Sequence, residues 1–207
     1  IFVNSGSSSN LLVWFTLADQ RSPIIKNGLS PGFEVIVPAV SWSTTIWPIV
    51  QAGGVPVLVD CDPASLTLSI EAVEAAIGPD TVAICPVHPL GNVCDMDALM
   101  AICQRHGLIL VEDACEALGS RYREREAGRF GLMGTYSFYF SHHMTTIEGG
   151  MIVTDDDDVA ELLRIQRAHG WSRKPQVDRD IPFDRRFHIV GLGFNLRPTE
   201  LNAAFGL

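Results

Sequence analysis

Two adjacent histidines, His142 and His143, stand in the stretch FSHHMTTIEGG at positions 140–150. A neutral imidazole takes up a proton near neutral pH, so either ring is a candidate general base. Neighbours on extended backbone point to opposite faces, so we expect only one of the two rings to enter a site. The same geometry argues against a metal site built from the pair. Packing without a chemical role is the alternative interpretation.

Carboxylates stand at the end of a short apolar run. The segment LILVED (108–113) ends in Glu112 and Asp113, and Glu116 follows three positions after Asp113. A carboxylate at the tip of a strand, in apolar surroundings, can pair with a ring nitrogen and hold it protonated. A helix cap is the alternative interpretation of these residues.

Three further stretches carry residues that suit a ligand. NSGSSSN (4–10) leads into a predicted helix, where backbone amides and hydroxyls can converge on an anion, although simple helix capping explains it as well. In SWSTT (41–45), Trp42 could lie flat on an aromatic ligand or belong to the core. FNLRPTE (194–200) places Asn195 beside a predicted helix start.

Strand-length apolar runs alternate with helical periodicity, which predicts an α/β fold with a mainly parallel sheet. The predicted strands are 33–40, 55–61, 81–88, 108–113, 134–140 and 150–155, and the predicted helices are 10–19, 43–52, 69–77, 95–106 and 156–169. A turn or hairpin is expected at 120–130, and a long functional loop or subunit contact after His169. Ligands bind such sheets where strands end and helices begin, so the stretches above are expected to meet at one edge.

The composition narrows the class of protein. With 207 residues, 47% hydrophobic and 19% charged, the chain predicts one globular unit or most of one. A net charge of −9 argues against nucleic acid or an anionic membrane as partner, and no apolar run reaches about 18 residues, so we expect a cytoplasmic protein. The five cysteines lack CxxC spacing, which argues against a disulfide scaffold or zinc site. The chain begins without Met in a predicted strand and ends just after a predicted helix start, so we expect part of a longer protein.

Taken together and in order, seven segments resemble the DegT/DnrJ/EryC1/StrS sugar aminotransferase family of fold-type I pyridoxal phosphate enzymes. They are NSGSSSNL, VPAVSWSTT, VDCDP, VHPLGN, VEDACEALGS, SFYFSHHMTTIEGG and GFNLRPTELNAA. The resemblance covers essentially the whole chain. It implies that residues 1–207 form an incomplete cofactor-binding large domain, a three-layer α/β/α unit like that of aspartate aminotransferase. A C-terminal small domain would then lie outside this chain.

The resemblance also implies specific contacts with pyridoxal 5′-phosphate. Asp113 would pair with the pyridine nitrogen, Glu116 would stand near the ring hydroxyl, Trp42 would stack on the ring, and Ser7, Ser8 and Ser137 would hold the phosphate. Asn195 would reach the phosphate in a neighbouring subunit, which implies a homodimer with a shared active site.

The chain departs from the family at one position. Where these aminotransferases carry the lysine that bonds to the cofactor, five residues after Ser137, this chain has His142. Its two lysines, Lys26 and Lys174, lie in no matching segment. Imidazole has no primary amine to condense with the cofactor aldehyde, so the cofactor would be held noncovalently and His142 would act as base. This change resembles the hexulose 3-dehydratase branch, which uses pyridoxamine phosphate to remove the C3 hydroxyl of a nucleotide-linked 4-keto-6-deoxyhexose.

Several alternatives stay open. One dehydratase branch takes electrons through an iron–sulfur cluster, but of the cysteines that resemblance requires only Cys115 is present, and a cluster needs about four thiolates. The other branch regenerates its cofactor with glutamate, and we favour it. A cofactor-binding protein without catalysis is a second class, and an ordinary sugar aminotransferase would need an amine at position 142. The nucleotide and the hexose are not identified by the sequence.

Overall fold

The structure, a computed structural model, describes residues 1–172 and 188–207. Most of the long loop expected after His169 therefore lies outside the described residues. The main sheet has seven strands in the order β1-β9-β8-β5-β4-β2-β3. They are β1 (Phe2–Val3), β2 (Glu34–Pro38), β3 (Val55–Val59), β4 (Thr81–Ile84), β5 (Ile109–Asp113), β8 (Met133–Ser137) and β9 (Gly150–Val153). The pairs among β3, β2, β4, β5 and β8 are all parallel, whereas β9 is antiparallel to both β8 and β1.

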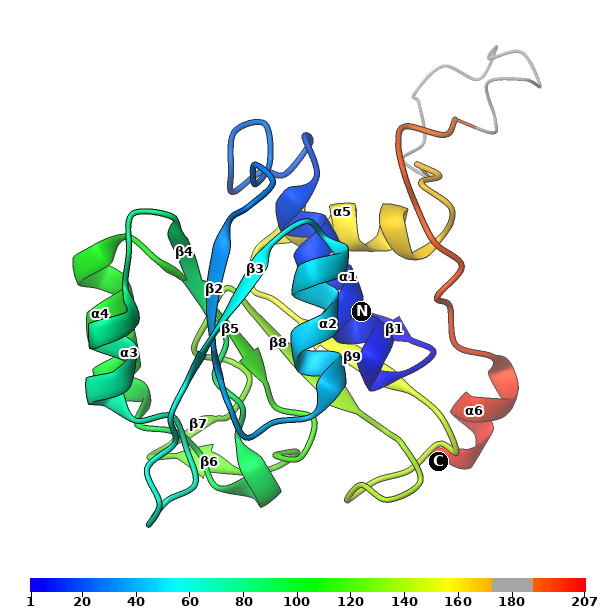
Figure 1. The fold of residues 1–207 in the computed structure, drawn as a ribbon. Coiled ribbons are helices and arrows are strands. Elements are labelled where there is room, and N and C mark those ends of the chain that lie inside the picture. The colour runs from blue at the N-terminus through cyan, green and yellow to red at the C-terminus, as the bar shows by residue number, and fades with distance from the viewer. Residues whose placement is uncertain (173–187) are drawn as a thin grey trace.

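Helices cover both faces of the sheet (Figure 1). They are α1 (Gly6–Ala18), α2 (Ser43–Gln51), α3 (Ile70–Ala76), α4 (Met96–His106), α5 (Asp157–Arg167) and α6 (Glu200–Phe205), with a short 3-10 turn, η1 (Pro89–Gly91). On β2, Val35 and Val37 pack with α1, α2 and α5, whereas Ile36 packs with α3 and α4. This alternation follows from the two-residue period of a strand. The expected three-layer α/β/α architecture with a mainly parallel sheet is confirmed.

The start of α1 differs from the prediction. We expected a loop at 4–10 and a helix from residue 10, but the helix begins at Gly6, and Ser5 caps it by accepting a hydrogen bond from the Ser8 amide at 3.1 Å. The apolar period that marks a helix begins only at Leu11, because the first turn is made of glycine and serine. Hydrophobic periodicity therefore does not predict a helix start whose first turn is polar.

Several local predictions are confirmed. Asp95 caps α4 by accepting from the Ala98 amide, and Gly107 ends that helix in the left-handed conformation with a φ of 67°. The segment 120–130 contains a hairpin of β6 (Arg121–Tyr122) and β7 (Arg125–Glu126). By contrast, the strand expected at 81–88 is shorter than predicted, because it ends at Ile84, two residues before a proline that lacks an amide proton for the ladder.

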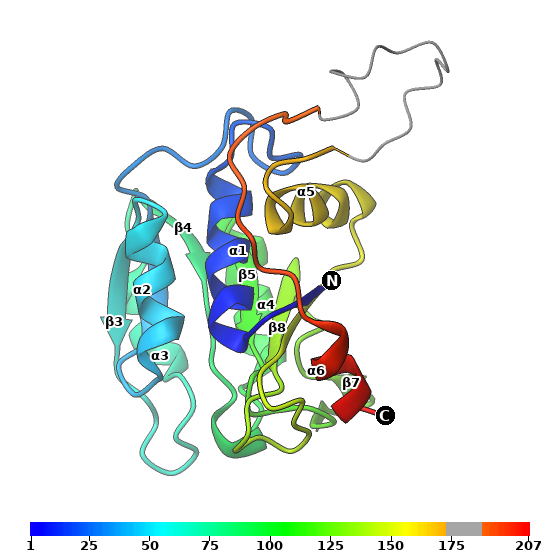
Figure 2. The same ribbon diagram turned by 90° about the vertical axis from the view of Figure 1, so that its right-hand side faces the viewer.

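The segment 188–207 returns along the β1 and β9 side of the sheet (Figure 2). The Asn4 amide donates to the Leu196 carbonyl at 2.8 Å, and Asn202 on α6 donates to the carbonyl of Thr146 at 2.9 Å. Helix α6 therefore packs on the loop between β8 and β9, the loop that carries His142. None of the helices in the described ranges is long and apolar enough to cross a membrane.

Candidate active site

The carboxyl ends of β5 and β8 bring two of the expected residues to one edge of the sheet. Asp113 ends β5 and pairs with Thr135 of β8, and Ser137 ends β8 two residues further on. Two residues of a strand span about 7 Å, which is comparable with the length of a substituted pyridine ring. The carboxylate and the hydroxyl can therefore meet the two ends of one flat ligand.

Three neutral donors hold the buried carboxylate of Asp113, a residue only 4% exposed. Its Oδ2 atom accepts from Asn10 Nδ2 at 2.9 Å and from Thr45 Oγ1 at 2.7 Å, and its Oδ1 atom accepts from the Cys115 amide at 3.1 Å. A carboxylate has about four acceptor sites, so a position on Oδ1 remains for a further donor. Residues 114–120 form turns, so the helix-cap interpretation of Asp113 is wrong.

The first turn of α1 meets the end of β8. A Cβ atom added to Gly6 would lie 2.5 Å from the Cβ of Ser137, so only glycine permits this approach. Ser7 is exposed and donates to Thr44 Oγ1 at 3.1 Å, while half-buried Ser8 accepts from the Ser5 hydroxyl at 3.0 Å. Unpaired amides and the positive end of a 13-residue helix, beside the Ser137 hydroxyl, suit an anion such as a phosphate.

Trp42 is 74% exposed at the position just before α2, so the interpretation of Trp42 as a core residue is wrong. It stands three residues before Thr45, whose hydroxyl reaches Asp113. The indole is therefore exposed at the start of the helix that holds Thr45.

Glu116 is tied to the neighbouring turn. Its Oε2 atom accepts from the Leu90 amide at 2.8 Å, and Leu90 has a φ of 52° within η1. This hydrogen bond anchors the loop after β4. The Glu116 carboxylate can still accept further hydrogen bonds.

The two histidines lie on the loop between β8 and β9. The His142 ring is half-buried and lies 6.2 Å from the Tyr139 ring between centroids, while His143 is exposed. Residues 140–144 form a turn followed by bends, so the extended backbone expected for the pair is wrong, although the two side chains differ in burial. Within residues 1–172 and 188–207, no three His, Cys, Asp or Glu side chains gather as metal ligands.

Asn195 lies apart from these residues in the single chain. Its side chain is exposed, and Oδ1 accepts from Arg197 at 3.2 and 3.1 Å. The structure does not bring Asn195 into the cluster around Asp113.

The structure shows two sets of residues that the sequence reasoning missed. Asn10, Thr45 and Thr135 surround Asp113, and the available signal was the position of Asn10 directly before the apolar run that starts at Leu11. The second set surrounds Glu112, to which the sequence assigned no separate role. Glu112 is fully buried, and its Oε2 atom lies 3.1 Å from Nε2 of His88.

Glu112 also accepts from three backbone amides, those of Gly128, Phe130 and Gly131, at 2.7, 2.6 and 2.8 Å. The carboxylate is therefore a structural anchor that fixes the loop before β8 against β5. Because Asp113 is the next residue in the chain, this anchor also fixes the strand tip that presents it.

Cys115 places a thiol beside Asp113. Burial of the thiol and the nearby Asp113 carboxylate raise the pKa of Cys115 well above its ordinary value. The group is therefore a neutral thiol near neutral pH.

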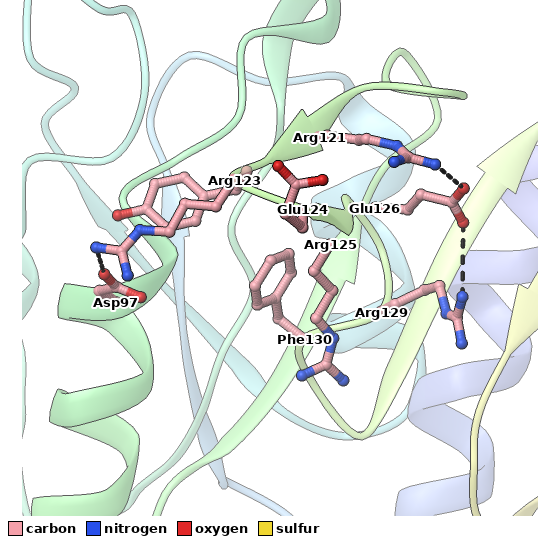
Figure 3. A pocket seen from close by; sticks show the side chains of 9 residues that line it. Asp97, Arg121, Arg123, Glu124, Arg125, Glu126, Arg129 and Phe130 are labelled. Atoms are coloured by element: carbon pink, nitrogen blue, oxygen red, sulfur yellow. Dashed lines mark hydrogen bonds and ion pairs between the residues drawn. The ribbon is translucent and has the colours of Figure 1, made fainter.

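A separate pocket of about 400 Å³ lies beside the β6–β7 hairpin (Figure 3). Its arginines have nearby partners: Arg121 and Arg129 with Glu126 at 3.3 and 3.6 Å, Arg123 with Asp97, and Arg125 over the Phe130 ring at 4.9 Å. Its charges are largely balanced, so the edge formed by β5 and β8 remains the better candidate site.

The residues at that edge fit a protonated heteroaromatic ring that carries a phosphate. They offer a buried acceptor at one end, helix amides and a serine hydroxyl at the other, and an open indole face. This set of residues, on a three-layer α/β/α architecture, is typical of the pyridoxal phosphate aminotransferases. A family model described as the DegT/DnrJ/EryC1/StrS aminotransferase family matches residues 1–207, and the chain belongs to this family.

Individual relatives narrow the comparison. The chain is 41% identical to the GDP-4-keto-6-deoxy-D-mannose 3-dehydratase of Yersinia pseudotuberculosis, over 100% of this chain and 53% of that protein. It is 40% identical to the GDP-perosamine synthase of Caulobacter vibrioides, over 89% of this chain and 47% of that protein. The chain thus spans about half the length of the curated relatives it matches.

A solved structure gives the same result. The fold matches GDP-4-keto-6-deoxymannose-3-dehydratase, solved with a trapped PLP-glutamate geminal diamine, with a TM-score of 0.91 and 40% identity. The match covers 100% of this chain and 54% of that chain.

Proposed function

We propose that this chain is part of the large domain of a pyridoxamine phosphate dependent 3-dehydratase. The enzyme would remove the C3 hydroxyl of a nucleotide-linked 4-keto-6-deoxyhexose in deoxysugar biosynthesis, in the cytoplasm. One observation carries the proposal: five residues after Ser137, where the family resemblance implies the cofactor lysine, this chain has His142. The chain is similar both to a 3-dehydratase and to a GDP-perosamine synthase, so the residue at position 142 is the feature that favours the dehydratase function.

The binding residues divide by the part of the cofactor they meet. Asp113 accepts from the ring nitrogen and keeps it protonated, and Trp42 covers the ring face. Glu116 lies toward the ring hydroxyl. Ser7, Ser8 and Ser137, with the amides of the first turn of α1, hold the phosphate. When bound, the protonated ring supplies an electron sink for loss of the C3 hydroxyl.

His142 moves a proton at the C4′ carbon of the cofactor. Its ring lies on the loop after β8, five residues beyond the phosphate hydroxyl, and it is half-buried. Histidine contributes proton transfer near neutral pH but no primary amine, so the cofactor stays free of a covalent bond to the chain.

The position of Lys26 supports noncovalent binding. Lys26 is exposed on the loop after α1, at the opposite edge of the sheet. Helix α1, with 13 residues, separates that loop from Gly6 by about 20 Å. Lys174 lies outside the described residues.

Glutamate is the proposed amino donor that restores pyridoxamine phosphate, as the PLP-glutamate adduct in a similar dehydratase suggests. We also propose a homodimer in which Asn195 of one subunit serves the phosphate site of its partner. Its exposed side chain in the single chain leaves it available for that contact. An iron–sulfur route is disfavoured because no cysteine stands between His142 and Asn195, where the resemblance places the further cysteines of that branch.

The test is to incubate the full-length protein with glutamate, pyridoxal 5′-phosphate and either GDP- or CDP-4-keto-6-deoxyhexose. The proposal predicts a 3-deoxy sugar together with ammonia and 2-oxoglutarate. A 4-amino sugar without ammonia would show an aminotransferase instead. Cofactor binding without any product, with either nucleotide, would favour a noncatalytic binding protein.

A further inference from the structure

We infer that Asn10 is a positioning residue that orients the Asp113 carboxylate so that Oδ1 faces the cofactor ring. The inference rests on the proposed function. Asn10 lies in α1 and is 6% exposed, yet both ends of its carboxamide are hydrogen-bonded. A buried amide is costly unless its donors and acceptors are satisfied, so Asn10 needs specific partners.

Its partners come from three other elements. Nδ2 donates to Asp113 Oδ2 at 2.9 Å and to the Thr44 carbonyl at 3.2 Å, and Oδ1 accepts from Thr135 Oγ1 at 2.6 Å. The Asp113 carboxylate and the Thr44 carbonyl can only accept, so they fix which end of the amide is the NH₂ group, and the Thr135 hydroxyl donates to the oxygen at the other end. Aspartate at this position would keep the shape and lose the donor.

The two oxygens of Asp113 are consequently different. Oδ2 accepts from two side chains, those of Asn10 and Thr45, whereas Oδ1 accepts from one backbone amide of the described residues, that of Cys115. Two lone pairs on each oxygen leave the open acceptor position on Oδ1. Asn10 and Thr45 therefore select the oxygen that is free to meet a ring nitrogen.

Helix α1 links both ends of the site. Gly6, at the proposed phosphate position, and Asn10, behind the carboxylate, are four residues apart, which is about 6 Å along a helix. One turn of one rigid helix thus sets the spacing between the phosphate site and the acceptor for the ring nitrogen. Asn10 therefore links the position of the phosphate site to that of the Asp113 carboxylate, and it has no contact of its own with the cofactor in this proposal.

The test compares Asn10→Ala and Asn10→Asp with Thr16→Val. Thr16 is the matched control, because it is buried on the same helix and donates to Gln166 at 2.7 Å, away from Asp113. The readouts are the ¹⁵N shift and pH titration of the ring nitrogen in bound, ¹⁵N-labelled pyridoxal 5′-phosphate, measured without substrate. Unfolding curves of each variant show whether a change follows from lost folding.

We expect both Asn10 variants, and not Thr16→Val, to change the pH at which the ring nitrogen loses its proton. Turnover should fall by about 10- to 100-fold with KM for the nucleotide sugar little changed, as for other residues that orient a functional group. Unchanged ring-nitrogen signals in a folded Asn10 variant, or equal changes in Thr16→Val, would overturn the inference.

Thr45 provides a second pair should the Asn10 variants fail to fold. Thr45→Val removes the other donor to Oδ2, while Thr45→Ser retains a hydroxyl. The inference predicts a changed ring-nitrogen titration in the first and rescue in the second, and identical behaviour of the two would contradict it. Because these readouts need no substrate, a protein that shows them but makes no deoxysugar would contradict the proposed function alone.

Discussion

The α-carbon of Gly6 lies so close to Ser137 that a Cβ atom on Gly6 would fall 2.5 Å from the Cβ and 2.8 Å from the Oγ of Ser137. This approach presses the first turn of α1 against the end of β8. Helix amides and the serine hydroxyl therefore share one small space, which we assign to the cofactor phosphate.

Gly6→Ala should weaken binding of pyridoxal 5′-phosphate by about 10-fold or more, equivalent to about 1.4 kcal/mol, because the added methyl displaces Ser137. Fluorescence titration of the cofactor measures this effect. Gly78→Ala is the matched control, since its Cβ would meet neighbours only at 3.7 Å and beyond. Adding Ser137→Gly to Gly6→Ala should restore the packing, seen as recovered stability. A Gly6→Ala protein with normal cofactor affinity would show that the contact does not shape the site.

Glu112→Gln should lower the free energy of unfolding by about 3 kcal/mol. The substitution replaces one carboxylate oxygen, which accepts hydrogen bonds, by an NH₂ group that faces backbone N–H donors. Glu126→Gln is the comparison. Glu126 is 43% exposed and pairs with Arg121 and Arg129, so its loss should cost less than about 1 kcal/mol. Urea unfolding of both variants measures the difference. Equal losses would mean that Glu112 is not the anchor of the loop before β8.

Cys115 should alkylate slowly and bind no cluster. Because its pKa is raised, the thiolate forms only at a pH above that of an ordinary cysteine, so the folded protein favours the protonated thiol below that range. We expect iodoacetamide at pH 8 to modify Cys115 about 10-fold more slowly than free cysteine, as followed by mass spectrometry. Cys115→Ser should retain turnover. Stoichiometric iron that is lost in Cys115→Ser would instead support the iron–sulfur alternative.

The sequence predicted the sheet, most helices and the identity of the strand-tip carboxylate because these depend on local periodicity. It placed the start of α1 late, since a Gly-Ser turn has no apolar period. Asn10 was missed for a different reason. Its partners Asp113 and Thr135 are 103 and 125 residues away, and hydrogen bonds across such distances follow from the packed fold and not from any local pattern.

The central claim is that His142 is the general base of the reaction. The rate of ammonia release from glutamate in the presence of a nucleotide 4-keto-6-deoxyhexose tests this role most directly. His142→Asn should bind the cofactor normally but release ammonia about 100- to 10,000-fold more slowly, the range that a general base contributes. His143→Asn, at the exposed neighbour, is the matched control and should keep nearly the full rate. Undiminished ammonia release by a folded His142→Asn protein would contradict the account.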